Sequence, residues 1–439
     1  MMYNRLLKIK PLLMLLFLAM LVLIVGCGKN DSANNSTDKG QVKLVFQNIY
    51  PDETATNHKV MKKIVNAYMD QHPDVRIDLD SLNIDQQKLK LKTQASGKNL
   101  PDIFVVNASA QMKPFVDEGL LAPLDDMLDK NTLRQTFQEG ILNYYTFDGK
   151  TYALPDGNNI GVMYYNKQIF SDLGLTPPQT FTELIDAVKK IKSEGIIPIA
   201  IAEKETWTGS ILFMNIVLRT NNGPGFLDDV IAGKKTFHDP AFIEAIEAFE
   251  ELVDAGAFQE GATTTEYAEA ETLFRTGQAA MYYMGTWATS GMETSDHKDY
   301  IDVFPFPTVH GKGNVRDFML APGSAFAIAQ NSPHLEQAKD FLNYFMLQWP
   351  KENFEMKAAV GLAQHVDGDF QKAGYSDISI NVLNLFQTVQ GGDLAFDNTM
   401  KPDVAQVHLK AIQRLFVEKV SPQDIADEHQ KAFEKSYAQ

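Results

Sequence analysis

Asp102-Ile103-Phe104-Val105-Val106 is a nearly continuous apolar run in a chain of 439 residues. Valine and phenylalanine favour pleated backbone, and an unbroken apolar run needs cover on both faces of a sheet. The run therefore predicts a strand in a central, parallel sheet.

Strand-like and helix-like segments alternate on both sides of this run. Val42-Lys43-Leu44-Val45-Phe46 predicts a strand, and Val60, Ile64 and Tyr68 follow it at helical spacing. Val75-Arg76-Ile77-Asp78-Leu79-Asp80 alternates between apolar and polar residues, as a half-exposed strand does. The alternation predicts an α/β architecture with helices packed on sheets.

Later segments continue this alternation and carry helix-start signals. Thr180 and Glu183 form a capping box, and Gly195 ends that helix before a predicted strand at Ile196-Ile197-Pro198-Ile199-Ala200-Ile201. Elsewhere a capping residue stands before a proline at the first helical position. We expect helices to begin at three such pairs, Asp239-Pro240, Ser332-Pro333 and Ser421-Pro422.

The N-terminus has the layout of an export signal. Arg5, Lys8 and Lys10 form a basic region, and Pro11 to Val25 form an uncharged apolar region. This apolar region is shorter than the roughly 20 residues of a membrane-spanning helix, and no positive cluster follows it. We therefore predict a signal peptide over residues 1–26.

The only cysteine, Cys27, directly follows Leu23-Ile24-Val25-Gly26. This arrangement resembles the bacterial lipobox, whose cysteine is diacylated and becomes the mature N-terminus, so the resemblance implies a palmitate-type anchor on Cys27. Two acyl chains give stable anchoring. The alternative is a signal peptide that happens to contain a free or buried thiol. Residues 27–40 are polar and lack aromatic and branched aliphatic side chains, which predicts a flexible tether.

Composition limits the function classes. The formal net charge is −16, which disfavours nucleic acid and anionic membrane faces as partners. Hydrophobic residues make up 44% of the chain, as in a globular protein. The roughly 400 residues after the tether exceed one ordinary core, so we expect two domains.

Seven sequence blocks of this body resemble, in their order and approximate spacing, the extracellular solute-binding proteins of ABC sugar importers. The resemblance extends over nearly the whole body of the chain. The blocks are Asn99-Leu100-Pro101-Asp102-Ile103, Gly119-Leu120-Leu121-Ala122-Pro123-Leu124, Asp148-Gly149-Lys150-Thr151-Tyr152-Ala153-Leu154-Pro155, Tyr165-Asn166-Lys167-Gln168-Ile169-Phe170, Leu173-Gly174-Leu175 with Pro177-Pro178-Gln179-Thr180-Phe181-Thr182-Glu183-Leu184, Phe274-Arg275-Thr276-Gly277-Gln278-Ala279-Ala280-Met281, and Gly285-Thr286-Trp287.

This resemblance implies an α/β, two-lobed periplasmic-binding-protein-like fold with hinge crossovers between the lobes. It also implies that the lobes close on a carbohydrate, which a membrane permease driven by a separate ATPase then imports. A monomer with no cofactor and no metal is expected. The predicted boundaries are 41–157 with 322–365 for lobe 1, and 158–321 with 366–439 for lobe 2.

A sugar presents apolar ring faces edged by hydroxyls, so its binder needs aromatic platforms and hydrogen-bonding groups. Trp287 ends an apolar strand at a glycine turn and matches the cleft tryptophan of the family, with a core tryptophan as the alternative. Trp207 and Glu205 lie in a loop that resembles the family's acid-and-aromatic loop, and plain solvent exposure is the alternative for Glu205. Trp349 matches no cleft motif and is expected in the core.

Polar candidates follow the first strands, where open α/β sheets leave a crevice. Asn48, Tyr50 and Glu53 follow the first predicted strand, and Asn107 and Ser109 follow the opening apolar run. The family usually places ligand contacts at these points. The alternative is turn capping by the asparagines and the serine.

Other candidates lie near the expected hinges and near the C-terminus. Asn158 and Asn159 fall at the first hinge, and Asn159 stands where maltose-binding relatives have an acid, which puts maltose-type specificity in doubt. Gly323 and Ser324 fall at the second hinge and offer a backbone donor and a hydroxyl, although flexibility alone would explain Gly323. Asp397 lies in a segment that reaches the cleft in relatives, with a solvated loop as the alternative.

A surface-anchored glycoside hydrolase is the enzymatic alternative, because two of the 56 acidic residues could flank a cleft. The sequence contains no nucleophile elbow, metalloprotease helix or phosphate-loop motif, and its nine histidines show no metal-ligand spacing. A structural adhesin would not need two hinged lobes. We therefore expect a binding protein for a neutral oligosaccharide, lipid-anchored on the extracellular face of the cell membrane of a Gram-positive-type bacterium.

Overall fold

The computed structural model describes residues 41–130 and 132–437. The predicted signal peptide 1–26, Cys27 and the tether 27–40 lie outside these residues. By its internal contacts, the chain from Val42 onward forms one compact unit. Among the described helices, none has both the length and the apolar composition needed to cross a bilayer.

A five-stranded sheet has the opening apolar run at its centre. The side chains from Ile103 to Val106 are buried, as predicted for a strand covered on both faces. Two parallel strands lie on one side of this run, but the two strands on its other side pair antiparallel, so the prediction of a purely parallel sheet is wrong. The reason is that one of these two strands returns to the sheet after a long excursion through another part of the fold. In spatial order the strands are β2 (Val75–Ser81), β1 (Val42–Asn48), β3 (Ile103–Asn107), β12 (Ser324–Ile328) and β6 (Ala153–Pro155).

A second, mixed sheet is built almost entirely from the middle of the chain. Its longest strand is buried at nearly every position and pairs antiparallel with three neighbours. In spatial order the strands are β13 (Gly391–Leu394), β11 (Asp317–Ala321), β7 (Asn159–Asn166), β9 (Ala279–Gly285) and β8 (Ile197–Ala200), and β10 (Ile301–Phe304) also pairs with β7. A separate ribbon joins β4 (Thr146–Phe147) to β5 (Lys150–Thr151).

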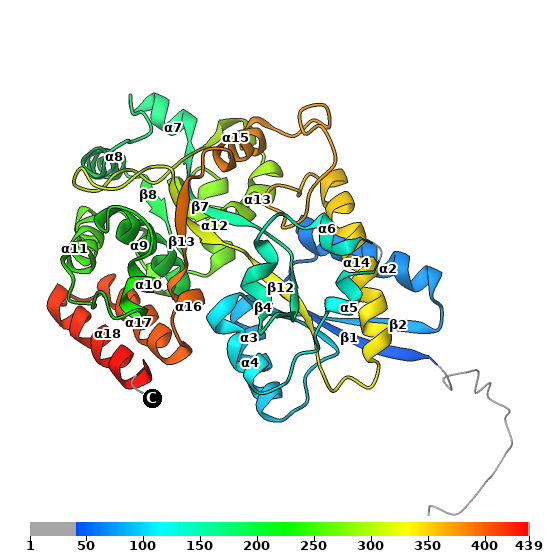
Figure 1. Cartoon of the computed structure of the whole chain (residues 1–439). Helices are drawn as coiled ribbons and strands as arrows, with labels where there is room; N and C mark the ends of the chain where they lie inside the picture. The colour runs from blue at the N-terminus through cyan, green and yellow to red at the C-terminus, as the bar shows by residue number, and fades with distance from the viewer. Residues whose placement is uncertain (1–40, 131, 438–439) are drawn as a thin grey trace, which may run out of the picture. The chain divides into compact units, whose positions relative to one another are not determined.

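We term the sheet that contains β1, together with the helices near it, the first lobe. Figure 1 shows the longest of them beside β1, β2 and β12. Trp349 of this helix is only 2% exposed and stacks on Phe345, so its predicted place in the core is confirmed. The elements are α2 (Thr56–Gln71), α3 (Ile84–Ser96), η1 (Ser109–Gln111), α4 (Lys113–Asp117), α5 (Asp125–Leu128), α6 (Leu133–Thr136), η2 (Ile141–Tyr145) and α14 (Leu335–Glu355).

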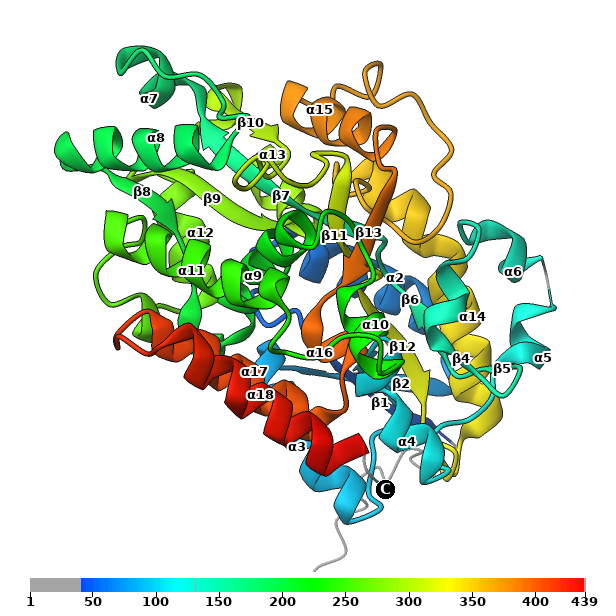
Figure 2. The same cartoon turned by 60° about the vertical axis from the view of Figure 1, so that its left-hand side comes forward.

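The sheet that contains β7, together with the helices near it, forms the second lobe. The last two helices of the chain pack against this lobe, as the rotated view in Figure 2 shows. The elements before residue 260 are α7 (Lys167–Asp172), α8 (Phe181–Ser193), η3 (Glu203–Glu205), α9 (Trp207–Thr220), α10 (Phe226–Ile231) and α11 (Pro240–Ala255). The later ones are η4 (Ala262–Thr264), α12 (Tyr267–Arg275), η5 (Thr286–Ala288), α13 (Thr289–Glu293), η6 (Lys298–Tyr300), α15 (Asp377–Phe386), α16 (Phe396–Thr399), α17 (Pro402–Leu415) and α18 (Pro422–Tyr437).

Three of the four predicted helix starts are confirmed. Thr180 and Glu183 form the capping box of α8, and α11 and α18 begin at the predicted prolines. The prediction at Ser332-Pro333 is wrong by two residues, since α14 begins at Leu335. The Ser332 hydroxyl donates to Asp102 Oδ1 at 2.6 Å, and its oxygen accepts from the His334 amide at 3.1 Å, so Ser332 closes a turn ahead of α14 and His334 takes the capping position.

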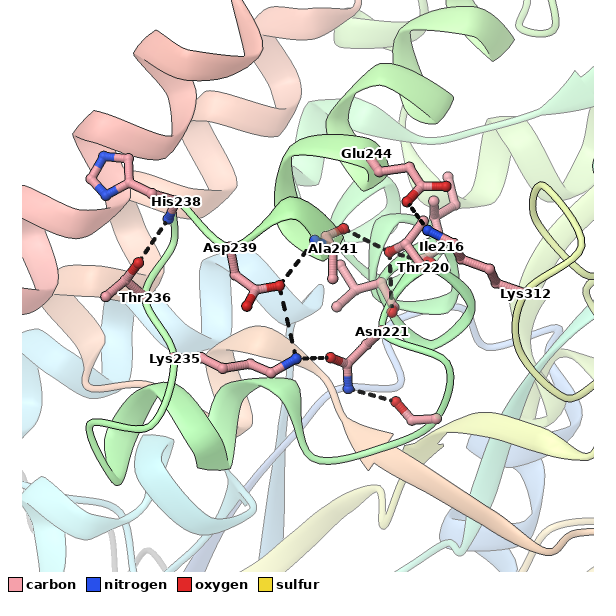
Figure 3. A network of polar contacts seen from close by, with 12 residues as sticks. Ile216, Thr220, Asn221, Lys235, Thr236, His238, Asp239, Ala241, Glu244 and Lys312 are labelled. Carbon is pink, nitrogen blue, oxygen red and sulfur yellow. Dashed lines mark hydrogen bonds and ion pairs between the residues drawn. The ribbon is translucent and has the colours of Figure 1, made fainter.

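The predicted cap of α11 belongs to a polar network that fixes this helix to α9 (Figure 3). Asp239 Oδ1 accepts from the Ala241 amide at 3.0 Å, and the Thr220 hydroxyl at the end of α9 donates to the Ala241 carbonyl at 2.7 Å. Lys235 Nζ donates to Asn221 Oδ1 at 2.6 Å and lies 3.8 Å from Asp239. These contacts fix the end of α9 to the start of α11.

The chain passes between the two sheets at short segments. One segment joins β6 to β7 through Asp156, Gly157 and Asn158, and a second joins β11 to β12 through Pro322 and Gly323. The chain passes again between α14 and α15. The positions of these three connecting segments fit the predicted lobe boundaries. The exact boundary residues remain a prediction.

Candidate ligand-binding site

Two predicted tryptophans and one tyrosine form an aromatic cluster in the second lobe. Trp207 begins α9, Trp287 lies in η5 directly after β9, and Tyr267 begins α12. The Trp207 ring centroid is 6.0 Å from that of Tyr267 in a stacked arrangement and 6.1 Å from that of Trp287. Both tryptophans keep partial exposure, so the cluster offers apolar ring faces.

Local backbone chemistry places these rings. Trp287 packs over Gly285, where an added Cβ would overlap the indole. Thr206 has a φ of +64°, an uncommon conformation for a non-glycine residue, and this turn directs Trp207 into the first turn of α9. The positions of the Trp287 and Trp207 rings thus depend on the tight turns that follow β9 and η3.

Sequence reasoning missed Tyr267. Its amide donates to Glu205 Oε1 at 3.2 Å, its ring stacks on Trp207, and its hydroxyl interacts with the side chains of Trp287 and Glu271. Tyr267 therefore contacts three of the predicted candidates, Glu205, Trp207 and Trp287. The available signal was its spacing of seven residues from Phe274, which puts both rings on one face of α12.

Several polar atoms in and beside the cluster are buried without a hydrogen-bond partner among the described residues. Buried polar groups without partners are uncommon in native proteins, because each costs about 1–3 kcal/mol. Glu205 and Trp207 come from the predicted loop, and Glu203 is fully buried behind them. The atoms are Glu203 Oε1, Glu205 Oε2, Trp207 Nε1 and Arg275 Nε.

The surroundings of the cluster are acidic. Burial raises the pKa of Glu205, and the charge of Asp85 in the first lobe adds to this effect. Burial also raises the pKa of Glu271, with a further contribution from Asp52, although Arg275 Nη1 lies 3.3 Å from Glu271. Acids of the two lobes therefore face one another near the aromatic rings.

In the first lobe, Tyr50 and Ser324 converge on a carboxylate that sequence reasoning did not single out. The Tyr50 hydroxyl donates to Asp156 Oδ2 at 2.6 Å, and the Ser324 hydroxyl donates to the same oxygen at 2.9 Å. Burial raises the pKa of Asp156 to about 6, while the two donated hydrogen bonds oppose this rise. The signal in the sequence was the position of Asp156 between β6 and the first hinge.

Gly323 lies beside this carboxylate. Its φ is +88°, and an added Cβ would lie 2.9 Å from Asp156 Oδ1 and 3.0 Å from the Gly157 carbonyl oxygen. The Tyr145 hydroxyl donates to the Pro322 carbonyl at 2.9 Å and to the Gly323 carbonyl at 2.7 Å. A glycine is thus required at this position by both backbone conformation and close approach.

The remaining first-lobe candidates are spread out. Asn48 is fully buried and accepts from the Tyr50 amide at 3.0 Å, which is the turn-capping alternative. Glu53 is exposed. Asn107 ends β3 opposite Ser324, and Ser109 has a φ of +54° at the start of η1. The structure brings Tyr50 and Ser324 together on Asp156.

The hinge asparagines bond to the protein itself. The Asn158 side chain donates to Gln138 Oε1 at 2.8 Å. Asn159 is 4% exposed, and its Oδ1 accepts from the Thr286 hydroxyl at 3.0 Å. Gly361 packs so closely on Asn159 that a Cβ there would overlap its side chain.

Asp397 takes part in a direct contact between the lobes. Its Oδ2 accepts from Gln111 Nε2 of η1 at 2.7 Å, and the neighbouring Asn398 donates to the Ala108 carbonyl at 3.0 Å. The nearby Phe396 ring stacks on buried His408 with centroids 3.7 Å apart. In this arrangement Asp397 therefore bridges the two lobes.

Two surface hollows lie elsewhere. One of about 650 Å³ lies beside α5 and the start of α14 in the first lobe, and one of about 280 Å³ lies between α12 and α13. Neither is lined by the aromatic cluster or by Asp156. Among the described residues, no group of three or more acidic, histidine or cysteine side chains is arranged to hold a metal ion.

A family model for bacterial extracellular solute-binding proteins matches residues 52–347. The chain belongs to this family. The match confirms the resemblance seen in the sequence blocks, and it confirms the prediction of a binding protein rather than an enzyme. This solute-binding protein has the two-lobed α/β fold that was predicted, as its similarity to solved structures shows.

Similar curated proteins include a multiple sugar-binding protein of Streptococcus mutans, 26% identical over 74% of this chain and 75% of the relative. An sn-glycerol-3-phosphate-binding periplasmic protein of Brucella melitensis is 26% identical over 60% of this chain and 58% of the relative.

Among solved structures, a chitin oligosaccharide binding protein superimposes with a TM-score of 0.83 at 26% identity, covering 91% of this chain and 100% of the other. A protein described in work on xylan utilization by Caldanaerobius polysaccharolyticus gives a TM-score of 0.82 at 29% identity, covering 89% and 99%.

Proposed function

We propose that this solute-binding protein captures a neutral oligosaccharide between its lobes and delivers it to an ABC importer. The observation that carries the proposal is the coincidence of two neighbouring, partly exposed indoles with buried polar atoms that lack partners at Glu205 and Trp207. Sugar rings stack on indole faces, and sugar hydroxyls both donate and accept hydrogen bonds. A sugar would supply the missing partners.

Charge favours a neutral ligand over an anionic one. Acids of both lobes surround the aromatic cluster, whereas Lys204 pairs with Glu266 and Arg275 pairs with Glu271. A phosphate or uronate would meet these acids without a free arginine fork to bind it. The sugar-binding relatives support this choice better than the glycerol-phosphate-binding relative does.

Closure on the ligand supplies the mechanism. The candidate residues come from both lobes, so a ligand that touches both stabilises the closed arrangement through contacts that the open one lacks. The proposal includes a ligand-binding role for the thirteen candidate residues named from the sequence. Trp207, Trp287, Tyr50 and Ser324 have the best support from their geometry.

A panel of sugars tests the proposal. Raffinose, xylotriose and chitobiose represent neutral ligands, and glucuronate and glycerol 3-phosphate represent anions. We expect saturable thermal stabilisation and a change in tryptophan fluorescence with at least one neutral sugar, and no release of shortened sugars. Tyr300→Ala serves as a control, because this second-lobe aromatic is 47% exposed and lies outside the cluster. Binding of the anions alone, or sugar cleavage, would contradict the proposal.

We also propose that Cys27 carries a lipid anchor that tethers a monomeric receptor near its permease, which a separate ATPase drives. The support is the lipobox-like sequence before Cys27 together with the extracellular family. A tether raises the effective concentration of the receptor at the importer. Cys27→Ser should abolish labelling with radioactive palmitate in cells and leave sugar affinity unchanged. Retained labelling would refute the anchor without affecting the binding role.

A further inference from the structure

Asp156 stands at the point where three parts of the first lobe meet the hinge. It follows β6, its amide donates to the Ser324 carbonyl at 3.0 Å, and its own carbonyl accepts from Trp349 Nε1 at 3.4 Å. Its carboxylate accepts from Tyr50, which follows β1, and from Ser324, which begins β12. The side chain therefore joins β1, β12 and the first crossover.

The two hydroxyl groups that bond to Asp156 have each used their only hydrogen. A tyrosine or serine hydroxyl has one hydrogen to donate and retains lone pairs that accept. Tyr50 and Ser324 are both partly exposed as residues. With both hydrogens donated to Asp156 Oδ2, the two oxygens can only accept from another molecule.

We propose that Asp156 is a specificity-determining residue: it presents the Tyr50 and Ser324 oxygens as acceptors, so that the ligand group bound there must be a hydrogen-bond donor such as a sugar hydroxyl. This inference rests on the proposed sugar-binding function and specifies the polarity of one edge of the site. The negative charge of Asp156 adds to the selection, because it repels carboxylate and phosphate groups.

The charged and titratable groups around Asp156 are few. Tyr50 and Tyr145 interact electrostatically with it, from the segment after β1 and from η2. On α14, Glu352 lies three residues beyond Trp349 and pairs with Lys63. Burial accordingly dominates, and the pKa of Asp156 rises to about 6 against the two donated hydrogen bonds.

A measurement without ligand tests the hydrogen-bond pattern first. The raised pKa means that the folded state holds this proton more tightly than the unfolded state, so stability from this group is present below about pH 4 and is lost as pH rises through 6. Thermal unfolding of the full chain between pH 3 and 8 should therefore show Asp156→Asn gaining in stability relative to the wild type as pH rises, with a midpoint between the unfolded-state pKa and the folded-state pKa and no further gain above about pH 6.

Removing a donor should move this midpoint. Tyr50→Phe and Ser324→Ala each delete a hydrogen bond that favours the carboxylate, so the midpoint of the difference from the corresponding Asp156→Asn double variant should shift to higher pH. Asp393→Asn is the matched control. Burial also raises the pKa of Asp393 to about 6, but this residue accepts from the Gly225 amide in the second lobe. Unchanged midpoints in both donor variants would overturn the proposal.

Sugar binding tests the specificity itself. For whichever neutral sugar of the panel binds, affinity of the wild type should fall by roughly tenfold from pH 7.5 to pH 5, because protonated Asp156 no longer holds both hydroxyls as acceptors. Asp156→Asn should lose this pH dependence, and Asp393→Asn should keep it. A wild-type pH profile in Asp156→Asn would overturn the proposal. If no sugar binds the wild type, the proposed function fails, while the ligand-free midpoints still decide whether Asp156 orders the two hydroxyls.

Discussion

The two lobes differ in how the polar groups on their sides of the candidate site are hydrogen-bonded. In the first lobe, the hydroxyls of Tyr50 and Ser324 are already bonded to Asp156. In the second lobe, Glu205 Oε2 and Trp207 Nε1 are buried without partners beside stacked rings. The first lobe thus has a defined hydrogen-bond polarity, whereas the second has unused hydrogen-bonding capacity. We infer that the second lobe contributes most of the binding energy and the first lobe selects the ligand group.

The largest expected effect on sugar affinity is at the aromatic cluster of the second lobe. Trp287→Ala should weaken binding of a neutral sugar by about 3 kcal/mol, or roughly a hundredfold, because truncated aromatic anchors cost this much at interfaces. Isothermal titration would measure the loss, and circular dichroism would check that the fold persists. An equal loss in Tyr50→Phe would remove the contrast between the lobes.

The second prediction concerns the close packing of Gly323 at the hinge. Gly323→Ala should lower the free energy of unfolding by about 2 kcal/mol, because it puts a Cβ against Asp156 at a strained φ. Denaturant unfolding measures this value. Gly119→Ala is the matched control, since Gly119 has a φ of +65° but no atom within 4 Å of an added Cβ. Equal losses in both variants would mean that backbone strain alone acts and the contact with Asp156 contributes nothing.

A third prediction concerns the buried acid behind the aromatic cluster. Burial raises the pKa of Glu203 to about 8, so the folded state keeps its proton and the stability from this group is lost as pH rises through that value. Between about pH 5 and pH 8 this single group should lower the free energy of unfolding by about 1.4 kcal/mol per pH unit.

Glu203→Gln should remove this slope, and chemical unfolding at pH 6, 7 and 8 would show it. The exposed Glu269→Gln is the control and should retain the wild-type slope. If Glu203→Gln also retained it, the Glu203 carboxyl group would not be the neutral acid that its burial implies.

The smallest effect is expected at the direct contact between the lobes. Gln111→Ala and Asp397→Asn should each weaken binding of every panel sugar by less than about 1 kcal/mol, because the first removes and the second weakens one partly exposed hydrogen bond between the lobes. Titration calorimetry would compare the two variants. A much larger loss in Asp397→Asn than in Gln111→Ala would show that Asp397 also contacts the ligand, as the sequence predicted.

The sequence predicted much of the fold because its signals are local. The apolar run at β3, the capping box at Thr180 and the cap at Asp239 depend only on neighbouring residues, and all three are confirmed. The prediction at Ser332 is wrong because this residue closes a turn with the His334 amide and bonds to Asp102, 230 positions away. Strand direction failed for the same reason, since β12 pairs with β3 from far along the chain.

The candidate site was predictable only in part. Trp207 and Trp287 stand in sequence blocks typical of the family, and they lie together in the structure. Tyr267 and Asp156 lie outside the sequence motifs of the family described above, and their importance comes from contacts across 60 residues or more with Trp207 and Tyr50. Such contacts carry no periodic pattern that a single sequence could reveal.

By itself, the sequence determined the α/β class, the family, the aromatic residue types of a sugar binder and the lipobox-like position of Cys27. These features depend on composition, spacing and short motifs. Only the tertiary structure decided which polar groups are bonded to the protein and which are left without partners. The physical reason is that burial and hydrogen bonding depend on what packs around a side chain, so the same aspartate can be an exposed loop residue or, as at Asp156, a buried acceptor for two hydroxyls.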